Sequence, residues 1–541
     1  MKNRKAGSRL VYLGVIFCLL VSMIFSGCSS PQPVTPQRNS PVPSAPEATP
    51  DEGPQYGGTL RIAKTEDALV LGNPSTMFRQ ACSVFGAPAI EKIVFFDSAG
   101  NLVPGLATGW DIDSAANTIT LTLREGVKFH DGTDFNADAV KWNFEKYLEQ
   151  KRSELLAIES MDVTSEYTIV LNLSNMDNML LPNLANVTGM IISPASYEQN
   201  GAEWAESNPV GTGPFKFVEW KRDERIVFER FDGYWQEGKP YLDKVEFEII
   251  TDPMVMKAAF QRGEVDAIIE LTENVAKELE NVADYRITKT GLPMRLHGLF
   301  PDSNNPNSAY ADVRVRQAVW HAIDRDALCH AVGLGYWEPL NQAAVKDSWV
   351  YNPKVKGYPF DQAKAKQLLA EAGFADGFKT TIYCLNLPPL PDVATIYQAF
   401  LQDVGIDAQI EIIDKGRFDV MVAGGGGWED GLTILWSSVV PNELTVQSRL
   451  MSRKVSAARL PSVYFPDEYQ DLLDEVIFAP DYKTMQQRTP ALMEMMTDKY
   501  ALVPYMYATN GIAARYDYVH DDGLYETLFS QWTPQDAWIE K

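Results

Sequence analysis

Hydrophobic residues repeat with two different periods along the chain from about Gly57 onward, and this mixture constrains the fold more than any other feature. Apolar residues alternate with threonines at 118–123 and with charged residues at 244–249, and a period of two indicates half-buried strands. At 361–373 a capping aspartate, an apolar stripe at helical spacing and a terminal glycine indicate a helix. Because both patterns are mixed throughout, and no repeat of roughly 20–50 residues occurs, we predict an α/β fold with several lobes.

Composition narrows the kind of protein. Of the 541 residues, 45% are hydrophobic and 11% aromatic, which suffices for two to four domains at about 150 residues each. With 48 basic and 72 acidic residues the formal charge is −24, and this excess of acid argues against nucleic acid as a partner. Only five cysteines occur, none of them at zinc-ligand spacing. We therefore predict no dense disulfide framework, no bound metal and no cofactor.

The N-terminal residues have the pattern of an export signal. Four basic residues precede Val11–Phe25, an uncharged apolar run of 15 residues, and a membrane-spanning helix needs about 20. Ser26, Gly27 and Cys28 follow. This arrangement resembles a bacterial lipoprotein signal, although Phe25 stands where such signals usually have Leu. The resemblance implies that residues 1–27 are removed and that Cys28 receives a diacylglycerol group, with an ordinary signal peptide as the alternative.

Residues 28–55 form a proline-rich segment, with eight prolines between Pro31 and Pro54 and almost no large apolar side chains. Such a segment cannot bury enough surface to fold, so we predict a disordered tether. Removal of residues 1–27 would take away four basic residues and no acidic ones, leaving a formal charge of −28. Anionic lipid would repel such a body. We therefore expect Cys28 alone to hold it on the bacterial cell membrane, facing the outside or the periplasm.

No catalytic signature is present in the sequence. GxSxG and HExxH do not occur, and the five histidines are scattered. Residues 233–239 spell GxxxxGK, but Pro240 stands where a P-loop needs the hydroxyl of Ser or Thr. We expect neither an enzyme nor a nucleotide-binding site.

Six phrases occur in an order that is typical of one protein family. They are LVPGLATGWDIDSAANTITLTLREGVKFHDGTDFNADA, NPVGTGPFKFVEW, FDGYWQEGKPYLDKVEFEII, FQRGEVDA, DVRVRQAVWHAIDRDAL and DQAKAKQLLAEAGF, which lie between Leu102 and Phe374. Together they resemble the family-5 extracellular solute-binding proteins of bacterial ABC importers, the peptide/nickel type. The resemblance runs from about Tyr56 to the C-terminus and becomes weaker after about Gly405.

The resemblance implies a two-lobed periplasmic-binding-protein fold of type II, with an extra inserted subdomain and a ligand cleft between the lobes. We expect lobe I at residues 56–100, 205–300 and 512–541. The inserted subdomain is expected at 101–204 and lobe II at 301–511. The lobes would close about a hinge when ligand contacts from both sides stabilise the closed state.

The implied function is that of a monomeric receptor that captures a small solute and delivers it to a membrane permease with its ATPase subunits. Peptides are the default solute of the family. A metal chelate, an opine or an oligosaccharide would suit the same role. A secreted hydrolase with an unrecognised site, or a signalling receptor without a transport role, are alternatives of a different class.

The resemblance also points to ligand-binding residues near 417–436. Oligopeptide binders of the family have a Gly-Trp-x-x-Asp phrase after a Tyr-Asp strand, and its aspartate pairs with the ammonium group of the peptide. With Phe418-Asp419 taken as that strand, AGGGGWEDGL follows. Neither of the two alignments of this stretch puts an aspartate at the last position of the phrase. When Trp428 is aligned with the tryptophan of the phrase, Asp430 is one residue short of that position. We expect Asp430 to meet a cationic group of the guest.

Other candidates follow from residue type. Trp428 and Trp436 are suited to stacking on a guest, with core packing as the alternative. Close approach of a guest's main chain is possible at a run of glycines, with a surface loop as the alternative, and the candidates are Gly425, Gly426 and Gly427. An anionic group could be met by Arg417 or by Arg79 beside Phe78, although exposed arginines are common.

Overall fold

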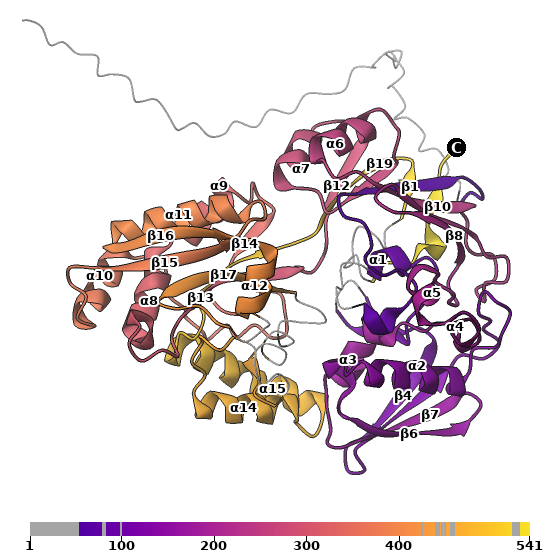
Figure 1. The fold of residues 1–541 in the computed structure, drawn as a ribbon, viewed down its shortest axis with the longest axis horizontal. Coiled ribbons are helices and arrows are strands. Elements are labelled where there is room, and N and C mark those ends of the chain that lie inside the picture. The colour runs from indigo at the N-terminus through magenta and orange to yellow at the C-terminus, as the bar shows by residue number, and fades with distance from the viewer. Residues whose placement is uncertain are drawn as a thin grey trace, which may run out of the picture. The chain divides into compact units, whose positions relative to one another are not determined.

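The computed structural model describes residues 53–77, 83–97, 100–422, 426–438, 444, 447, 451–454, 460–521 and 531–541. Residues 53–541 form one compact unit. Cys28, the export signal and most of the predicted tether lie outside the described residues. A seven-stranded, a six-stranded and a four-stranded sheet are present in the described part, together with helices (Figure 1). The predicted α/β fold is therefore confirmed.

The seven-stranded sheet is assembled from distant parts of the chain, in the order β12-β19-β11-β1-β10-β9-β8. Its central strand β1 pairs in parallel with both β10 and β11. The alternation predicted at 244–249 is that of β10, where Val245 and Phe247 are fully buried. The strands are β1 (Thr59–Lys64), β8 (Phe215–Lys221), β9 (Arg225–Arg230), β10 (Lys244–Ile249), β11 (Ala267–Ile269), β12 (Tyr285–Lys289) and β19 (Ile512–Tyr516), and the accompanying helices are α1 (Ser83–Gly86), α6 (Pro253–Gln261) and α7 (Glu273–Leu279).

The four-stranded antiparallel sheet lies in the chain between β1 and β8, in the order β4-β5-β7-β6. Helix α2 presents Val140, Phe144 and Tyr147 to the same hydrophobic cluster as Leu121 of β5. The elements of this part are β2 (Val94–Phe96), β3 (Leu102–Pro104), β4 (Ala107–Asp113), β5 (Thr118–Leu123), α2 (Ala137–Glu149), β6 (Ile158–Ser165), β7 (Thr168–Leu173), α3 (Leu180–Leu184), α4 (Pro194–Asn200) and α5 (Ala202–Ser207).

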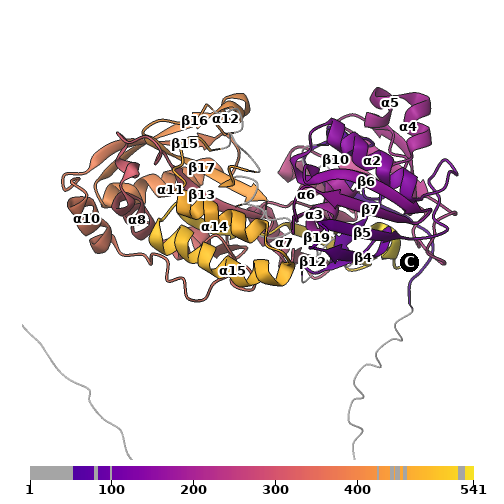
Figure 2. The ribbon, with the colours of Figure 1, turned by 90° about the horizontal axis from the view of Figure 1, so that it is seen from below.

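The six-stranded sheet has the order β14-β18-β13-β17-β15-β16. Its helices include α14 and α15, which lie side by side in both ribbon views (Figures 1 and 2). The elements are β13 (Arg295–Pro301), α8 (Val313–Ala322), α9 (Arg325–Ala331), β14 (Trp337–Pro339), α10 (Gln362–Glu371), β15 (Phe378–Leu385), α11 (Leu390–Asp403), β16 (Ile406–Ile413), α12 (Lys415–Val422), β17 (Gly431–Ser438), α14 (Asp467–Ile477), α15 (Tyr482–Glu494) and β18 (Tyr505–Thr509), followed nearer the C-terminus by the ribbon of β20 (Val519–His520) and β21 (Trp538–Ile539).

Two adjacent chain segments connect the seven-stranded and six-stranded sheets. One runs from β12 to β13, and the other runs from β18 to β19 through Asn510 and Gly511. Buried Thr290 joins them: its backbone N donates to Gly511 O at 2.9 Å, and its hydroxyl accepts from Gly511 N at 3.0 Å. Asn510 Nδ2 donates to Thr290 O at 2.6 Å. The structure is therefore two-lobed with a paired crossing, and the boundary predicted at residue 300 falls inside β13.

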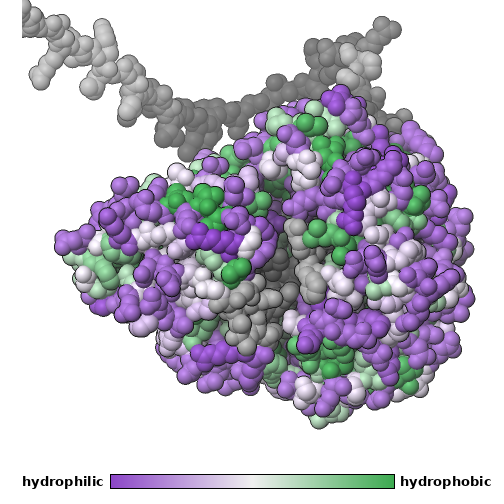
Figure 3. Space-filling model, in the orientation of Figure 1, coloured by the Kyte–Doolittle hydropathy of each residue, from purple (hydrophilic) through white to green (hydrophobic). Residues whose placement is uncertain are grey.

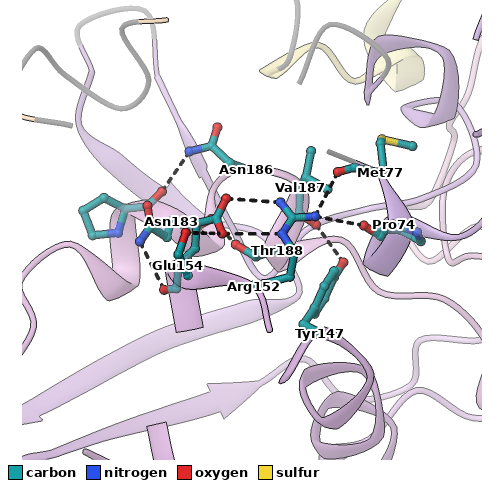
Figure 4. Close-up of polar contacts among 11 residues, drawn as sticks. Pro74, Met77, Tyr147, Arg152, Glu154, Asn183, Asn186, Val187 and Thr188 are labelled. Carbon is teal, nitrogen blue, oxygen red and sulfur yellow. Dashed lines mark hydrogen bonds and ion pairs between the residues drawn. The ribbon is translucent and has the colours of Figure 1, made fainter. Parts of the chain in front are cut away.

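A buried arginine, Arg152, makes hydrogen bonds between the segment before residue 78 and the part of the chain that contains the four-stranded sheet (Figure 4). Arg152 Nη1 donates to Met77 O at 2.9 Å, and Nη2 donates to Glu154 Oε1 at 3.2 Å. Nearby, the Tyr147 hydroxyl donates to Val187 O at 2.7 Å. Arg152 thus links the loop after α2 to the segment around Pro74, and Tyr147 links α2 itself to Val187. On the face shown in Figure 3, hydrophilic residues predominate and apolar residues form small groups. Among the described helices, none is long and apolar enough to cross a membrane.

Candidate functional site

A pocket of about 480 Å³ is formed by residues from three parts of the fold. One wall comes from the four-stranded sheet, where Ile112 of β4 lies opposite Ile119 of β5. Leu292, in the first crossing segment, forms another part of the lining. The remaining wall belongs to the lobe of the six-stranded sheet, with Trp349 and Tyr482. A molecule in this pocket would therefore contact both lobes and the segment that connects them.

Aromatic rings give the pocket much of its apolar surface. Trp349 and Tyr482 form a corner, with ring centroids 5.7 Å apart and planes at 60°. Tyr482 begins α15, whose start is capped by the Asp481 carboxylate accepting from Thr484 N at 2.7 Å. Trp110 of β4 and Phe96 of β2 also line the pocket. These two rings lie far in sequence from Trp349 and from Tyr482, and the fold brings them together.

The charged groups in the described lining of this pocket are acidic. Asp177 and Asp347 line it, and its described lining includes no Lys, Arg or His. Asp177 lies between β7 and α3, and its carboxylate accepts a hydrogen bond from Met179 N at 2.8 Å. Burial raises the pKa of Asp177 to about 6, because a carboxylate is less well solvated there than in water. Asp347 is exposed.

Asp177 also lines a second pocket, of about 410 Å³. The other charged side chains of its described lining are Glu154 and Lys454. Lys454 Nζ pairs with Asp474 at 2.9 Å, and Glu154 pairs with Arg152 at 3.2 Å. Both are therefore engaged with partners other than Asp177.

The loop that carries Asp177 follows β7 of the four-stranded sheet and contacts the lobe of the six-stranded sheet. Asn178 is buried, and its Nδ2 donates to Ala479 O, in the turn between α14 and α15, at 2.6 Å. Met179 is buried in the same hydrophobic cluster as Ile477 of α14. One three-residue segment thus lines the pocket and makes a direct contact between lobes.

A row of stacked rings crosses the six-stranded sheet near its junction with the crossing segments. It runs from Trp337 through Tyr507, His297 and Trp436 to Phe418, with successive centroids 4.2, 4.4, 6.2 and 5.7 Å apart. Neighbouring strands place the first four rings, since Trp436 is opposite His297 in the β13–β17 pairing. Burial lowers the pKa of His297 well below its usual value, so this imidazole is neutral at pH 7.

The structure disfavours stacking of a guest on either predicted tryptophan. Trp436 has Phe418 on one side and His297 on the other. Trp428 is only 4% exposed, and its backbone N donates to Ser462 Oγ at 2.7 Å. Packing within the protein accounts for both side chains better than contact with a guest.

The other described candidates have local partners and do not line the 480 Å³ pocket. Asp430 is exposed, with its backbone N donating to Asp302 Oδ2 at 2.8 Å. Arg417 pairs with Glu411 on the surface. Gly426 is exposed, and Gly427 adopts a φ of +67° against Ser462. Three further candidates, Phe78, Arg79 and Gly425, lie outside the described residues.

The predicted position of the family phrase is wrong, because Phe418 and Asp419 lie in helix α12 and not in a strand. The strand of this region is β17, which begins directly after Asp430 and contains Trp436. If the phrase is carried by β17, the third residue after Trp436 is Val439. That position has no carboxylate to pair with an ammonium group.

The lining of the 480 Å³ pocket was not predicted as a site. Trp110 and Tyr482 are single aromatic residues without a motif, and Asp177 and Asp347 are 170 residues apart in sequence. Part of the lining, namely Leu102, Trp110, Ile112 and Ile119, lies within the first of the six phrases, but that phrase identifies the family and not a site.

Comparison with known proteins gives consistent results for sequence and structure. A model of "Bacterial extracellular solute-binding proteins, family 5 Middle" matches residues 101–443. The glutathione-binding protein GsiB of Pectobacterium atrosepticum is 33% identical over 348 residues, 63% of this chain and 67% of that protein. GsiB of Salmonella typhi is 32% identical over 344 residues, 61% of this chain and 65% of that protein. The chain thus spans about two thirds of the length of these relatives.

Solved structures match over a larger share of the chain. DppA of Helicobacter pylori, a periplasmic binding protein in complex with the peptide STSA, has a TM-score of 0.76 at 25% identity, covering 90% of this chain and 99% of that one. CtaP of Listeria monocytogenes, an ABC transporter substrate binding protein, has a TM-score of 0.79 at 22% identity, covering 90% and 100%. The second likeness concerns the fold alone.

Proposed function

The chain belongs to the bacterial extracellular solute-binding proteins of family 5, as its six phrases predict, and we propose that it captures a small peptide for an ABC importer. One observation carries the proposal: the 480 Å³ pocket has walls from both lobes and from the crossing segment at Leu292. A guest there stabilises the arrangement in which the two lobes are close together, because only that arrangement offers all of its contacts. The choice of a peptide is supported by relatives and neighbours that bind glutathione and the peptide STSA.

Capture by this route needs no covalent chemistry. The described lining of the pocket contains no His, Cys or Ser–His pair that could act as a nucleophile with its base. Within the described residues, no group of three or more His, Cys, Asp or Glu side chains is placed to hold a metal ion. A receptor that binds and releases its solute unchanged accounts for this lining better than a hydrolase does.

The remaining parts of the proposal concern location and assembly. We place the protein outside the cytoplasmic membrane, attached through a lipid on Cys28, working as a monomer with a permease and its ATPase subunits. The division into lobe I, inserted subdomain and lobe II is kept, and it is supported by one large sheet in each of the three parts. Mass spectrometry of protein from cells tests the anchor, and an unmodified N-terminal residue other than Cys28 would contradict it.

A melting experiment tests solute capture directly. Residues 53–541, the compact unit, are heated with di- to pentapeptides, glutathione, sugars and metal chelates. A true guest present at 100 times its dissociation constant stabilises the folded state by about 2.7 kcal/mol. We expect at least one peptide to raise the melting temperature and to be recovered uncleaved. If no compound does so, or if peptides are cleaved, the proposal fails.

A further inference from the structure

We propose that the 480 Å³ pocket selects a guest whose protonated amine lies beside apolar groups, for example the N-terminus of a peptide with apolar side chains. The inference rests on the proposed function and adds the chemical class of the solute. Three features of the pocket lead to it: the sign of its charges, the environment of Asp177 and the arrangement of its aromatic rings.

The first feature is the sign of the charges. Asp177 and Asp347 are the charged residues of the described lining, and the other polar side chains are the neutral Asn101, Asn178, Ser348, Tyr482 and Gln486. An anionic guest would meet no opposite charge in this lining and would be repelled by both carboxylates. A cationic group would meet two carboxylates and several neutral hydrogen-bond acceptors.

The second feature is the environment of Asp177. Its carboxylate has one hydrogen bond from the described protein, donated by the backbone N of Met179 at 2.8 Å. No described cation pairs with it, because nearby Lys454 pairs with Asp474 and Arg152 pairs with Glu154. Asp177 is half-buried, and a carboxylate that is partly removed from water without a counter-charge is costly. A protonated amine in the pocket would supply the missing charge and the missing hydrogen bonds.

The third feature is the set of aromatic rings that line the same pocket as these carboxylates. Trp349 and Tyr482 meet at 60° with centroids 5.7 Å apart, and Trp110 lines the same cavity. The negative face of an aromatic ring attracts an ammonium group, and the attraction grows when water is excluded. Ile112, Ile119 and Leu181 add aliphatic surface, which suits the apolar part of the guest. Together these groups fit an amine on an apolar molecule better than a heavily hydrated ion.

The test compares probes that differ only in the amine. Residues 53–541 are titrated calorimetrically with the amides of Leu-Leu, Phe-Leu and Val-Val, and with the N-acetyl form of each. We expect at least one free amine to bind, at least tenfold more tightly than its acetylated partner. Equal affinity within any bound pair, or failure of all three free amines to bind, overturns the inference. Neither outcome depends on a variant that folds.

Two variants assign the effect to the carboxylate. Asp177→Asn keeps the shape and removes the charge, and it should reduce the preference for the free amine to below threefold. Asp376→Asn removes an exposed charge outside the described pocket lining and should leave the preference unchanged. If a solute without a free amine binds while all amine probes fail, solute capture stands and this inference falls. If nothing binds at all, the proposed function itself fails.

Discussion

The paired crossing between the lobes predicts a specific loss of stability when one hydroxyl is removed. Thr290 is 1% exposed, and its Oγ1 accepts from Gly511 N at 3.0 Å and donates to Leu292 O at 2.8 Å. Thr290→Val keeps the branched shape but leaves both partner groups unsatisfied. An unsatisfied buried group costs about 1–3 kcal/mol. Gly511 is buried and Leu292 is half-buried, so we expect the free energy of unfolding to fall by about 1–3 kcal/mol.

A matched control lies two residues away on β12. Thr288 Oγ1 is buried and has no hydrogen-bond partner among the described residues, so Thr288→Val removes a hydroxyl that makes no bond. That variant should be neutral or slightly stabilising. Urea unfolding of residues 53–541, followed by intrinsic fluorescence, measures both as shifts of the midpoint at constant slope. If the two variants differ by less than about 0.5 kcal/mol, the role given to the Thr290 hydroxyl at the crossing is wrong.

Three further predictions concern the pocket and one glycine. Trp349→Ala should weaken binding of a peptide amine at least tenfold in calorimetry, whereas Trp204→Ala, at an exposed site outside the pocket lining, should not change it. The pKa of Asp177 is raised from 3.8 to about 6, so the folded state holds an extra proton between these pH values. The stability that this proton contributes should be lost as pH rises towards 6. Asp177→Asn should remove this pH dependence from the melting temperature of the guest-free protein, and an unchanged pH profile would contradict the assignment. Gly427→Ala should lower the free energy of unfolding by about 1–3 kcal/mol, because φ is +67° and the new Cβ would lie 2.6 Å from Ser462 Oγ, whereas Gly109→Ala, with no atom within 4 Å of its Cβ, should cost less than about 1 kcal/mol in the same urea assay.

The fold was largely predictable because periodicity is a local signal. The alternations at 118–123 and 244–249 became β5 and β10, and the capped stripe after Asp361 became α10. Local pattern failed at Phe418-Asp419, where two residues of a family phrase were read as a strand. The surrounding segment Lys415–Val422 is helical, and its short length leaves too few turns for a helical period to be visible.

The lining of the 480 Å³ pocket was not predicted from the sequence, for a physical reason. Sequence reasoning ranked residues by type, so glycine runs, tryptophans and arginines between 417 and 436 were chosen. In the structure, Trp428 is 4% exposed and Arg417 pairs with Glu411. The pocket instead depends on the closeness of Trp110, Asp177 and Trp349. That closeness arises only after three separate sheets and a crossing segment have packed, and no local pattern encodes it.

The loop at residues 177–179 gives a physical link between a bound guest and the relation of the two lobes. Asp177 lines the pocket, Asn178 donates to Ala479 O at 2.6 Å, and Met179 is buried with Ile477. A cation that pairs with Asp177 would restrain the segment whose next two residues contact α14 and the turn after it. Ordering them before the contact forms lowers the entropy cost of that contact. Guest binding and lobe contact thus favour each other. By linkage, a permease that strengthens the lobe contact would raise the affinity for the guest, and a permease that breaks the contact would lower it.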